Sequence, residues 1–236
     1  MKEKIKSIIF DFDDTVHDTS YGVLKILPAL DKYGKKIGIP NLGDMIDEMD
    51  FHFVKKARLH KDVSYFNRMT WIKEANKKYN LKLNQKQMKQ IFHEYWKVIL
   101  HNPKPHPDAK FVLSELKKKY KLYLMSDSDG TLAVKRKKVA NSGLRKYFNG
   151  VVYGDMVKTT KPDKRYYSYL AKKHNVDLNS CIMVGDKPPY DLEPAKKLGM
   201  KTIWIKKGRW SKRNNGKVFN YVDYKINNLK ELLKIL

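Results

Sequence analysis

Two alternating aspartates follow directly on a short apolar segment near the start of the chain. The stretch from Ile8 to His17 reads IIFDFDDTVH, so that Asp11 and Asp13 come immediately after the apolar run. An apolar run that ends in turn-type polar residues is typical of a buried strand that delivers its last side chains to the edge of a sheet. Two carboxylates this close cannot both stay ionised unless a cation or hydrogen bonds stabilise them. The pair therefore predicts a metal site, and one aspartate is suited to act as a nucleophile.

Other polar residues stand at the ends of apolar runs, or in the loops between them, later in the chain. They are Ser126, Lys161, and Asp186 with Asp191. Taken singly, each has an ordinary role: a serine in a turn, a lysine in a loop, an aspartate that caps the next helix. The carboxyl ends of parallel strands meet at one edge of a sheet, so residues far apart in the sequence can share a site there. Their occurrence in this order favours one common site over four coincidences.

Strands and helices alternate in the parts of the chain that carry these residues. Apolar segments predict strands at residues 5–10, 122–125, 151–153, 181–184 and 202–205. Helical segments lie between them, two of them with an aspartate at the expected cap, Asp108 and Asp163. Strands separated by helices form βαβ units, so we expect an α/β fold with a Rossmann-like, doubly wound parallel sheet.

The segment between the first two strands reads as helix throughout. We expect helices from about residue 20, at 44–60, from a cap at Ser64 to Tyr79, and after Asn84, which forms a capping-box pattern with Gln87. Pro103, Pro105 and Pro107 then interrupt the chain. The sequence therefore predicts a core of residues 1–16 and 102–236, with residues 17–101 inserted as a helical domain.

These residues together resemble the four motifs of the haloacid dehalogenase superfamily. The matching segments, in order, are DFDDT at 11–15, the strand-terminal Ser126, the Lys161-Pro162 pair, and GDKPPYD at 185–191. The combination is specific, although a DxD pair alone would be weak, and the resemblance covers nearly the whole chain. The helical segment resembles the cap that this superfamily inserts after its first strand. The chain is most similar to small phosphatases of the phosphoglycolate and glyceraldehyde-phosphate type, because the dehalogenase branch lacks an acid/base aspartate at the position of Asp13.

The resemblance implies a role for each motif residue. Asp11 would attack phosphorus and form an aspartyl-phosphate, and Asp13 would protonate the leaving alcohol and later deprotonate the attacking water. Ser126 and the backbone N–H next to it, at Asp127, would bind phosphate oxygens, while Lys161 would neutralise the nucleophile and the phosphoryl charge. This division of tasks is chemically sound, because phosphoryl transfer depends mainly on positioning and charge stabilisation.

The resemblance also implies Mg²⁺ as cofactor. Its ligands would be the Asp11 carboxylate, the Asp13 backbone carbonyl and Asp186, with Asp191 as a further ligand or as a residue that orients the others. Oxygen ligands of this kind suit octahedral Mg²⁺.

Two positions depart from the most frequent pattern of the superfamily. Asp127 stands where relatives often have asparagine, and Asp14 where glycine is common. A carboxylate beside a bound phosphate is unfavourable unless it points away, so we expect the Asp127 side chain to face elsewhere.

The composition limits the partners. The 236 residues include 50 Lys+Arg against 25 Asp+Glu, a formal net charge of +25. The basic residues are spread along the chain and no RNA- or DNA-binding motif is present, so a lysine-rich surface explains the charge better than a nucleic-acid partner. The single cysteine, Cys181, fits a reducing compartment, and no apolar run is long enough for a membrane helix or a signal peptide. We expect a cytoplasmic monomer or homodimer.

The expected function is Mg²⁺-dependent hydrolysis of a small phosphomonoester, such as phosphoglycolate or a triose phosphate. Three alternatives stay open: a phosphosugar mutase of the same superfamily, a phosphatase acting on nucleic-acid ends, and a nucleic-acid or protein binder without activity. The first would release isomerised phosphosugar instead of phosphate, and the second would bind oligonucleotides with a steep salt dependence. The intact motif set opposes the third.

Overall fold

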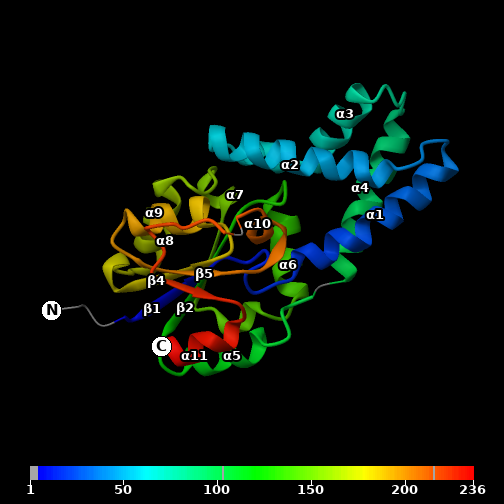
Figure 1. Ribbon diagram of the computed structural model, residues 1–236. Coiled ribbons are helices and arrows are strands. Elements are labelled where there is room, and N and C mark those ends of the chain that lie inside the picture. The colour runs from blue at the N-terminus through cyan, green and yellow to red at the C-terminus, as the bar shows by residue number, and fades with distance from the viewer. Residues whose placement is uncertain (1–4, 103, 215) are drawn as a thin grey trace.

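Six parallel strands form the centre of the molecule. The computed structural model describes residues 5–102, 104–214 and 216–236. The strands are β1 (Ser7–Phe10), β2 (Lys121–Ser126), β3 (Gly150–Tyr153), β4 (Cys181–Gly185), β5 (Lys201–Ile205) and β6 (Tyr224–Ile226). Their order across the sheet is β3-β2-β1-β4-β5-β6, and each neighbouring pair is parallel. The predicted doubly wound α/β sheet is confirmed (Figure 1).

Strand β1 lies where the chain reverses its direction of winding. The chain passes from β1 outward to β2 and β3, then returns to β4 on the other side of β1. Ile8 and Phe10 face one hydrophobic cluster and Ile9 faces another, because successive side chains of a strand point to opposite faces. In open α/β sheets, ligands bind beyond the carboxyl ends of the strands at such a switch point. The residues after β1 and β4 occupy this position.

Helices cover both faces of the sheet. On one face pack α5 (Ala109–Lys117), α6 (Leu132–Asn141) and α11 (Leu232–Ile235), and on the other pack α8 (Lys164–His174) and α9 (Glu193–Lys196). Two further short helices, α7 (Gly154–Val157) and α10 (Gly208–Arg213), follow β3 and β5. Within the described parts of the chain, none of the helices combines the length and apolar character needed to cross a membrane.

Four longer helices form a separate layer beside the end of the sheet. They are α1 (Thr19–Lys36), α2 (Leu42–His60), α3 (Arg68–Lys78) and α4 (Gln85–His101), and they share their own hydrophobic cluster (Figure 1). The capping box predicted at the start of α4 is confirmed, since the Asn84 and Gln87 side chains each accept a hydrogen bond from the other's backbone N–H.

One expected helix start is wrong, and another has the expected residue at its N-terminus without the expected side-chain bond. The predicted helix from Ser64 is two elements: a 3₁₀ turn, Val63–Phe66, capped by Asp62, and then α3, which Asn67 caps. Asx caps at both positions compete for the backbone N–H groups, so the chain bends between them instead of running on as one helix. Asp108 precedes α5 but does not cap it, because its carboxylate accepts from the backbone N–H of Lys230 instead.

The two segments that join the helical layer to the sheet are hydrogen-bonded to each other. Asp18 donates its backbone N–H to the carbonyl of Lys104, and His106 donates to that of Val16, at 2.7 and 3.0 Å. The Nε2 atom of His17 accepts from the backbone N–H of Lys104 at 3.1 Å. Of the three prolines expected at this boundary, Pro103 lies outside the described residues. The two connections are therefore held together as one hydrogen-bonded pair.

Candidate active site

Asp11 and Lys161 form the centre of the site. Asp11 follows β1 and is buried, and its Oδ1 atom lies 2.5 Å from the Nζ atom of Lys161, which has no exposed surface. The Thr15 hydroxyl donates to the other oxygen of Asp11 at 3.3 Å. Burial raises the pKa of Asp11, although the Lys161 ammonium opposes this shift. The lysine thus favours the ionised, nucleophilic form of a carboxylate that burial alone would protonate.

A cluster of three carboxylates adjoins this pair. Asp11, Asp186 and Asp191 each place one oxygen within 4.8 Å of the others. Asp186 has no exposed surface, and its Oδ2 atom lacks a hydrogen-bond partner among the described residues. Burial raises the pKa of Asp186 well above its usual range, and the nearby Asp11 and Asp191 raise it further, against the Lys187 ammonium. Buried, converging carboxylate oxygens with an unsatisfied acceptor have the donor chemistry of a site for a hard divalent cation such as Mg²⁺.

The loop after β4 has a shape that this cluster requires. Asp191 lies 2.6 Å from Lys161 Nζ, and its other oxygen accepts from the backbone N–H of Lys187 at 3.0 Å. A Cβ atom at Gly185 would come within 2.6 Å of the Asp191 carboxylate, so only glycine fits there. The Lys187 ammonium bonds Asp186 Oδ1 at 2.7 Å and approaches the Asp13 carbonyl at 3.4 Å. A cation bound to these two oxygens would have to displace it.

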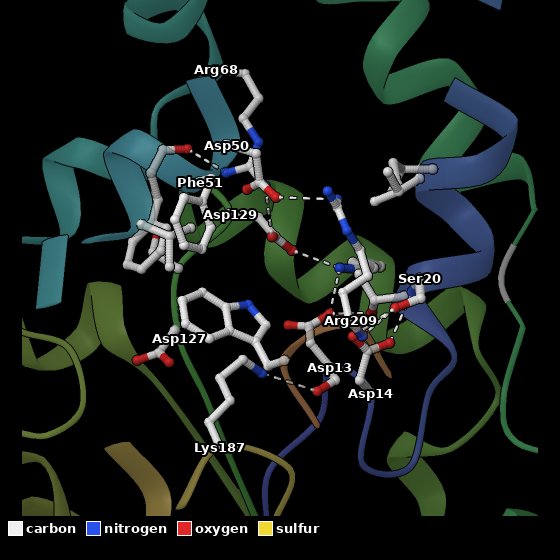
Figure 2. A pocket seen from close by; sticks show the side chains of 18 of the residues that line it. Asp13, Asp14, Ser20, Asp50, Phe51, Arg68, Asp127, Asp129, Lys187 and Arg209 are labelled. Atoms are coloured by element: carbon white, nitrogen blue, oxygen red, sulfur yellow. Dashed lines mark hydrogen bonds and ion pairs between the residues drawn. The ribbon is translucent and has the colours of Figure 1, made fainter. Parts of the chain in front are cut away.

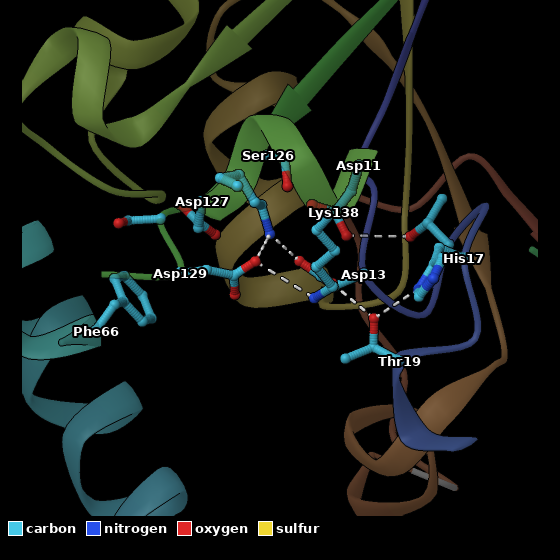
Figure 3. A network of polar contacts seen from close by, with 12 residues as sticks. Asp11, Asp13, His17, Thr19, Phe66, Ser126, Asp127, Asp129 and Lys138 are labelled. Atoms are coloured by element: carbon cyan, nitrogen blue, oxygen red, sulfur yellow. Dashed lines mark hydrogen bonds and ion pairs between the residues drawn. The ribbon is translucent and has the colours of Figure 1, made fainter. Parts of the chain in front are cut away.

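Asp13 is held by two buried lysines that the sequence analysis missed. Lys135 and Lys138 of α6 lie 2.5 and 2.6 Å from its two carboxylate oxygens, and the Thr19 hydroxyl donates to it at 2.6 Å (Figure 3). Burial opposes ionisation, but the two ammonium groups outweigh it and hold the pKa of Asp13 well below its usual range. The lysines stand in the run KRKK, which looks like an exposed basic face. Their spacing of three places both on one side of α6, which is the only signal that the sequence offers.

Ser126 and Asp127 end β2 beside Asp11. The Ser126 hydroxyl is buried and has no hydrogen-bond partner among the described residues. The Asp127 carboxylate accepts from the Thr160 hydroxyl and the Lys161 backbone N–H at 2.6 and 3.1 Å. It is not turned away from the site as expected, because it lines the cleft and its Oδ2 atom lies 3.6 Å from Lys161 Nζ. The Ser126 hydroxyl is available for an anion.

The backbone conformation explains the second departure from the superfamily pattern, which is Asp14. Asp14 has a φ of +61°, in the left-handed region where glycine is favoured and aspartate is tolerated. Its carboxylate accepts from the backbone N–H and the hydroxyl of Ser20 at 2.8 and 3.0 Å. These bonds anchor the first turn of α1 beside the site.

Arg58, from the helical layer, completes the surroundings of Asp127. Its Nη2 atom lies 2.5 Å from Asp127, and its Nη1 atom donates to the Thr160 hydroxyl and the Lys161 carbonyl, both at 2.7 Å. Burial would raise the pKa of the Asp127 carboxyl, but the Arg58 guanidinium and the Lys161 ammonium outweigh it and hold this pKa well below its usual range. Arg58 was not predicted, because it lies in a helix with other basic residues and far from its partners along the chain.

A cleft opens above these groups, between the sheet edge and the helical layer. Figure 2 shows Asp13, Asp14 and Lys187 at one end, and Asp50 with Arg68 at the other. Aromatic side chains line it from both parts of the molecule: Phe51, Phe66, Tyr95, Trp96 and Trp210. Helix α10, which follows β5, closes one side, where Arg209 makes a bidentate ion pair with Asp47 of α2 at 2.6 and 2.7 Å.

His17 does not line the cleft. It is buried against Phe12 with ring centroids 4.8 Å apart, and its Nδ1 atom bonds the Thr19 hydroxyl at 3.1 Å. Burial and the neighbouring Lys138 lower its pKa to about 3. A neutral imidazole therefore supports the paired connections between the helical layer and the sheet and, through Thr19, the position of Asp13.

Comparisons with known proteins agree with this geometry. The family model described as haloacid dehalogenase-like hydrolase matches residues 5–199. A glyceraldehyde 3-phosphate phosphatase of Pyrococcus furiosus is 29% identical over 99% of this chain and 93% of its own length. The human N-acylneuraminate-9-phosphatase is 24% identical over 86% of this chain and 84% of its own length.

Solved structures show the same fold. The HAD-hydrolase YfnB of Bacillus subtilis, in a crystal form described as bound to magnesium, superposes with a TM-score of 0.79 at 20% identity, over 99% of each chain. A HAD phosphatase of Thermococcus onnurineus superposes with a TM-score of 0.67 at 27% identity, over 98% of this chain and 97% of that one.

Proposed function

The chain belongs to the haloacid dehalogenase-like hydrolase family, and its relatives mark it as a phosphatase of small phosphorylated metabolites; from this premise we propose that it works through an aspartyl-phosphate on Asp11 with Mg²⁺ as cofactor. The observation that carries the proposal is the position of Asp11. It contacts the Lys161 ammonium and lies close to the carboxylates of Asp186 and Asp191, and the Ser126 hydroxyl nearby has no partner among the described residues. The ammonium favours the ionised form of Asp11, as a nucleophile for phosphorus requires.

In the first step, an Asp11 oxygen attacks phosphorus and the bond from phosphorus to the ester oxygen breaks. Ser126 and the adjacent backbone N–H groups hold the phosphoryl oxygens, and Lys161 balances the charge that moves from Asp11 to them. The leaving oxygen takes its proton from Asp13. When bound to Asp11, Asp186 and the Asp13 carbonyl, Mg²⁺ would neutralise charge on the transferred phosphoryl group.

In the second step, Asp13 takes a proton from water, which attacks phosphorus and frees Asp11 and inorganic phosphate. The observed contacts with Lys135 and Lys138 suit this task, because they keep Asp13 in the carboxylate form. Its task as an acid requires that at least one of these ion pairs be broken while it carries the proton. The lysines thus set how readily Asp13 passes between its two roles.

We further propose that residues 17–101 act as a cap on a core of residues 1–16 and 102–236. Helix α2 contributes Asp50, Phe51 and Arg58 to the cleft, while the attacking and metal-binding residues come from the sheet. Movement about the two hydrogen-bonded connections between the helical layer and the sheet would open and close the cleft. Closure would exclude water from the reacting groups.

A phosphate-release screen over phosphorylated metabolites tests the proposal. We expect release with Mg²⁺, loss of release with EDTA, and loss in Asp11→Asn. Asp44→Asn, an exposed change on α2, is the control and should be fully active. Release that survives in Asp11→Asn would contradict the mechanism, and an isomerised phosphosugar as the only product would identify a mutase.

A further inference from the structure

The end of the cleft away from Asp11 carries hydrogen-bonding groups that the proposed chemistry does not use. Trp96 of α4 lines the cleft with only 6% of its surface exposed, and its Nε1 donor has no hydrogen-bond partner among the described residues. A buried donor without an acceptor is costly, and an indole N–H can only donate. The indole of Trp96 therefore needs an acceptor that the described residues do not supply.

Asp50 offers hydrogen-bond acceptors in the same cleft. It lies on α2 and lines the cleft, and its nearest cation is the Nη1 atom of Arg209 at 3.7 Å, beyond hydrogen-bond distance (Figure 2). Arg209 is already committed to Asp47 through two short bonds. Asp50 therefore has acceptor capacity facing the cleft that no residue within the described ranges is seen to fill.

The charges around Asp50 limit what can bind there. Arg68 and Arg209 flank it, and Asp129 lies nearby, 3.8 Å from Arg68 and 3.1 and 3.4 Å from Lys135 and Lys138. An added carboxylate would face Asp50 and Asp129, and an added ammonium would face the two guanidinium groups. A neutral ligand avoids both penalties.

We propose that this end of the cleft binds a neutral, polyhydroxylated leaving group, with Asp50 accepting from one substrate hydroxyl and Trp96 Nε1 donating to another. Hydroxyls are the neutral groups that both donate and accept, so one leaving group satisfies both residues. The aromatic side chains that line the cleft suit the C–H faces of such a molecule. This inference rests on the proposed function and chooses within it: phosphates of sugars and polyols are preferred over phosphoglycolate, whose leaving group carries a carboxylate.

Three esters separate the possibilities: glycerol phosphate, phosphoglycolate and p-nitrophenyl phosphate, whose leaving group has no free hydroxyl to offer. The wild-type protein, Asp50→Asn and Trp96→Phe are assayed with Mg²⁺ on each, with Asp44→Asn as the matched control on α2. Circular dichroism and thermal denaturation of each variant establish that it is folded.

We expect wild type to prefer glycerol phosphate to phosphoglycolate. Asp50→Asn should lower kcat/KM for glycerol phosphate by about tenfold or more, since a bond to a charged group is lost. Trp96→Phe should lower it by about fivefold, the loss of a neutral hydrogen bond. Both variants should stay within about twofold of wild type on p-nitrophenyl phosphate.

Other results have distinct meanings. Preference for phosphoglycolate, or equal losses on all esters in both variants, or no loss in either, would overturn the inference and leave the phosphatase proposal standing. Failure of wild type to release phosphate from any of the three esters would overturn the proposed function, and the inference with it.

Discussion

Arg58 Nη2 lies 2.5 Å from Asp127 Oδ2, and this buried ion pair joins the helical layer to the loop that follows β2. The same guanidinium bonds the Lys161 carbonyl. The aspartate that departs from the common asparagine at this position thus has a cation from another part of the chain. A change in either residue should affect the fold and the site together.

Replacement of Arg58 by Met should lower the free energy of unfolding by about 3–5 kcal/mol at neutral pH, because a buried carboxylate loses its partner. The folded state holds the pKa of Asp127 below its unfolded value of about 3.9, so this stabilisation is complete above that pH and is lost as the pH falls below it. Urea denaturation of both proteins at neutral pH and at acidic pH measures the difference in the free energy of unfolding. The exposed Arg165, paired with Asp163, gives the control, and Arg165→Met should cost less than about 1 kcal/mol. An equal loss at acidic and neutral pH would contradict the account.

Metal affinity should distinguish Asp186 from Asp13. Asp186→Asn removes a carboxylate from the buried cluster, so we expect Mg²⁺ affinity to fall by about tenfold or more. Asp13→Asn keeps its backbone carbonyl and should bind Mg²⁺ within a few-fold of wild type while losing turnover. Isothermal titration calorimetry measures both, without dependence on activity. Equal loss of affinity in the two variants would show that the Asp13 side chain, and not its carbonyl, holds the metal.

Replacement of Lys138 by Met should move the pH profile of dephosphorylation. Lys138 is one of two cations that lower the pKa of Asp13, so its removal raises that pKa. Asp13 must be a carboxylate to accept a proton from water, and activity is lost as the pH falls through its pKa. The acidic limb should therefore shift to higher pH in Lys138→Met. The exposed Lys137 on the same helix is the control, and Lys137→Met should leave the limb in place. An unmoved limb in Lys138→Met would show that Asp13 is not the base.

The fold and the motif residues were predictable because both depend on local sequence. Asp11, Ser126 and Asp186 each follow an apolar run, and parallel strands bring such positions to one edge of the sheet. Arg58 and Lys138 were not predictable, since each stands among other basic residues and only the tertiary packing shows which cations are buried against an aspartate. The helix expected from Ser64 failed for a related reason. In the structure, Asp62 and Asn67 cap two separate elements there.

The central claim, that Asp11 carries the phosphoryl group, is tested most directly in Asp13→Asn. With p-nitrophenyl phosphate and Mg²⁺, the leaving group needs no proton, so the first step should proceed, and the second should stall because the base is missing. Acid quenching followed by mass spectrometry should find one phosphoryl group on the peptide that contains Asp11, together with a single burst of nitrophenol. Sustained nitrophenol release at the wild-type rate, with the Asp11 peptide unmodified, would contradict the account.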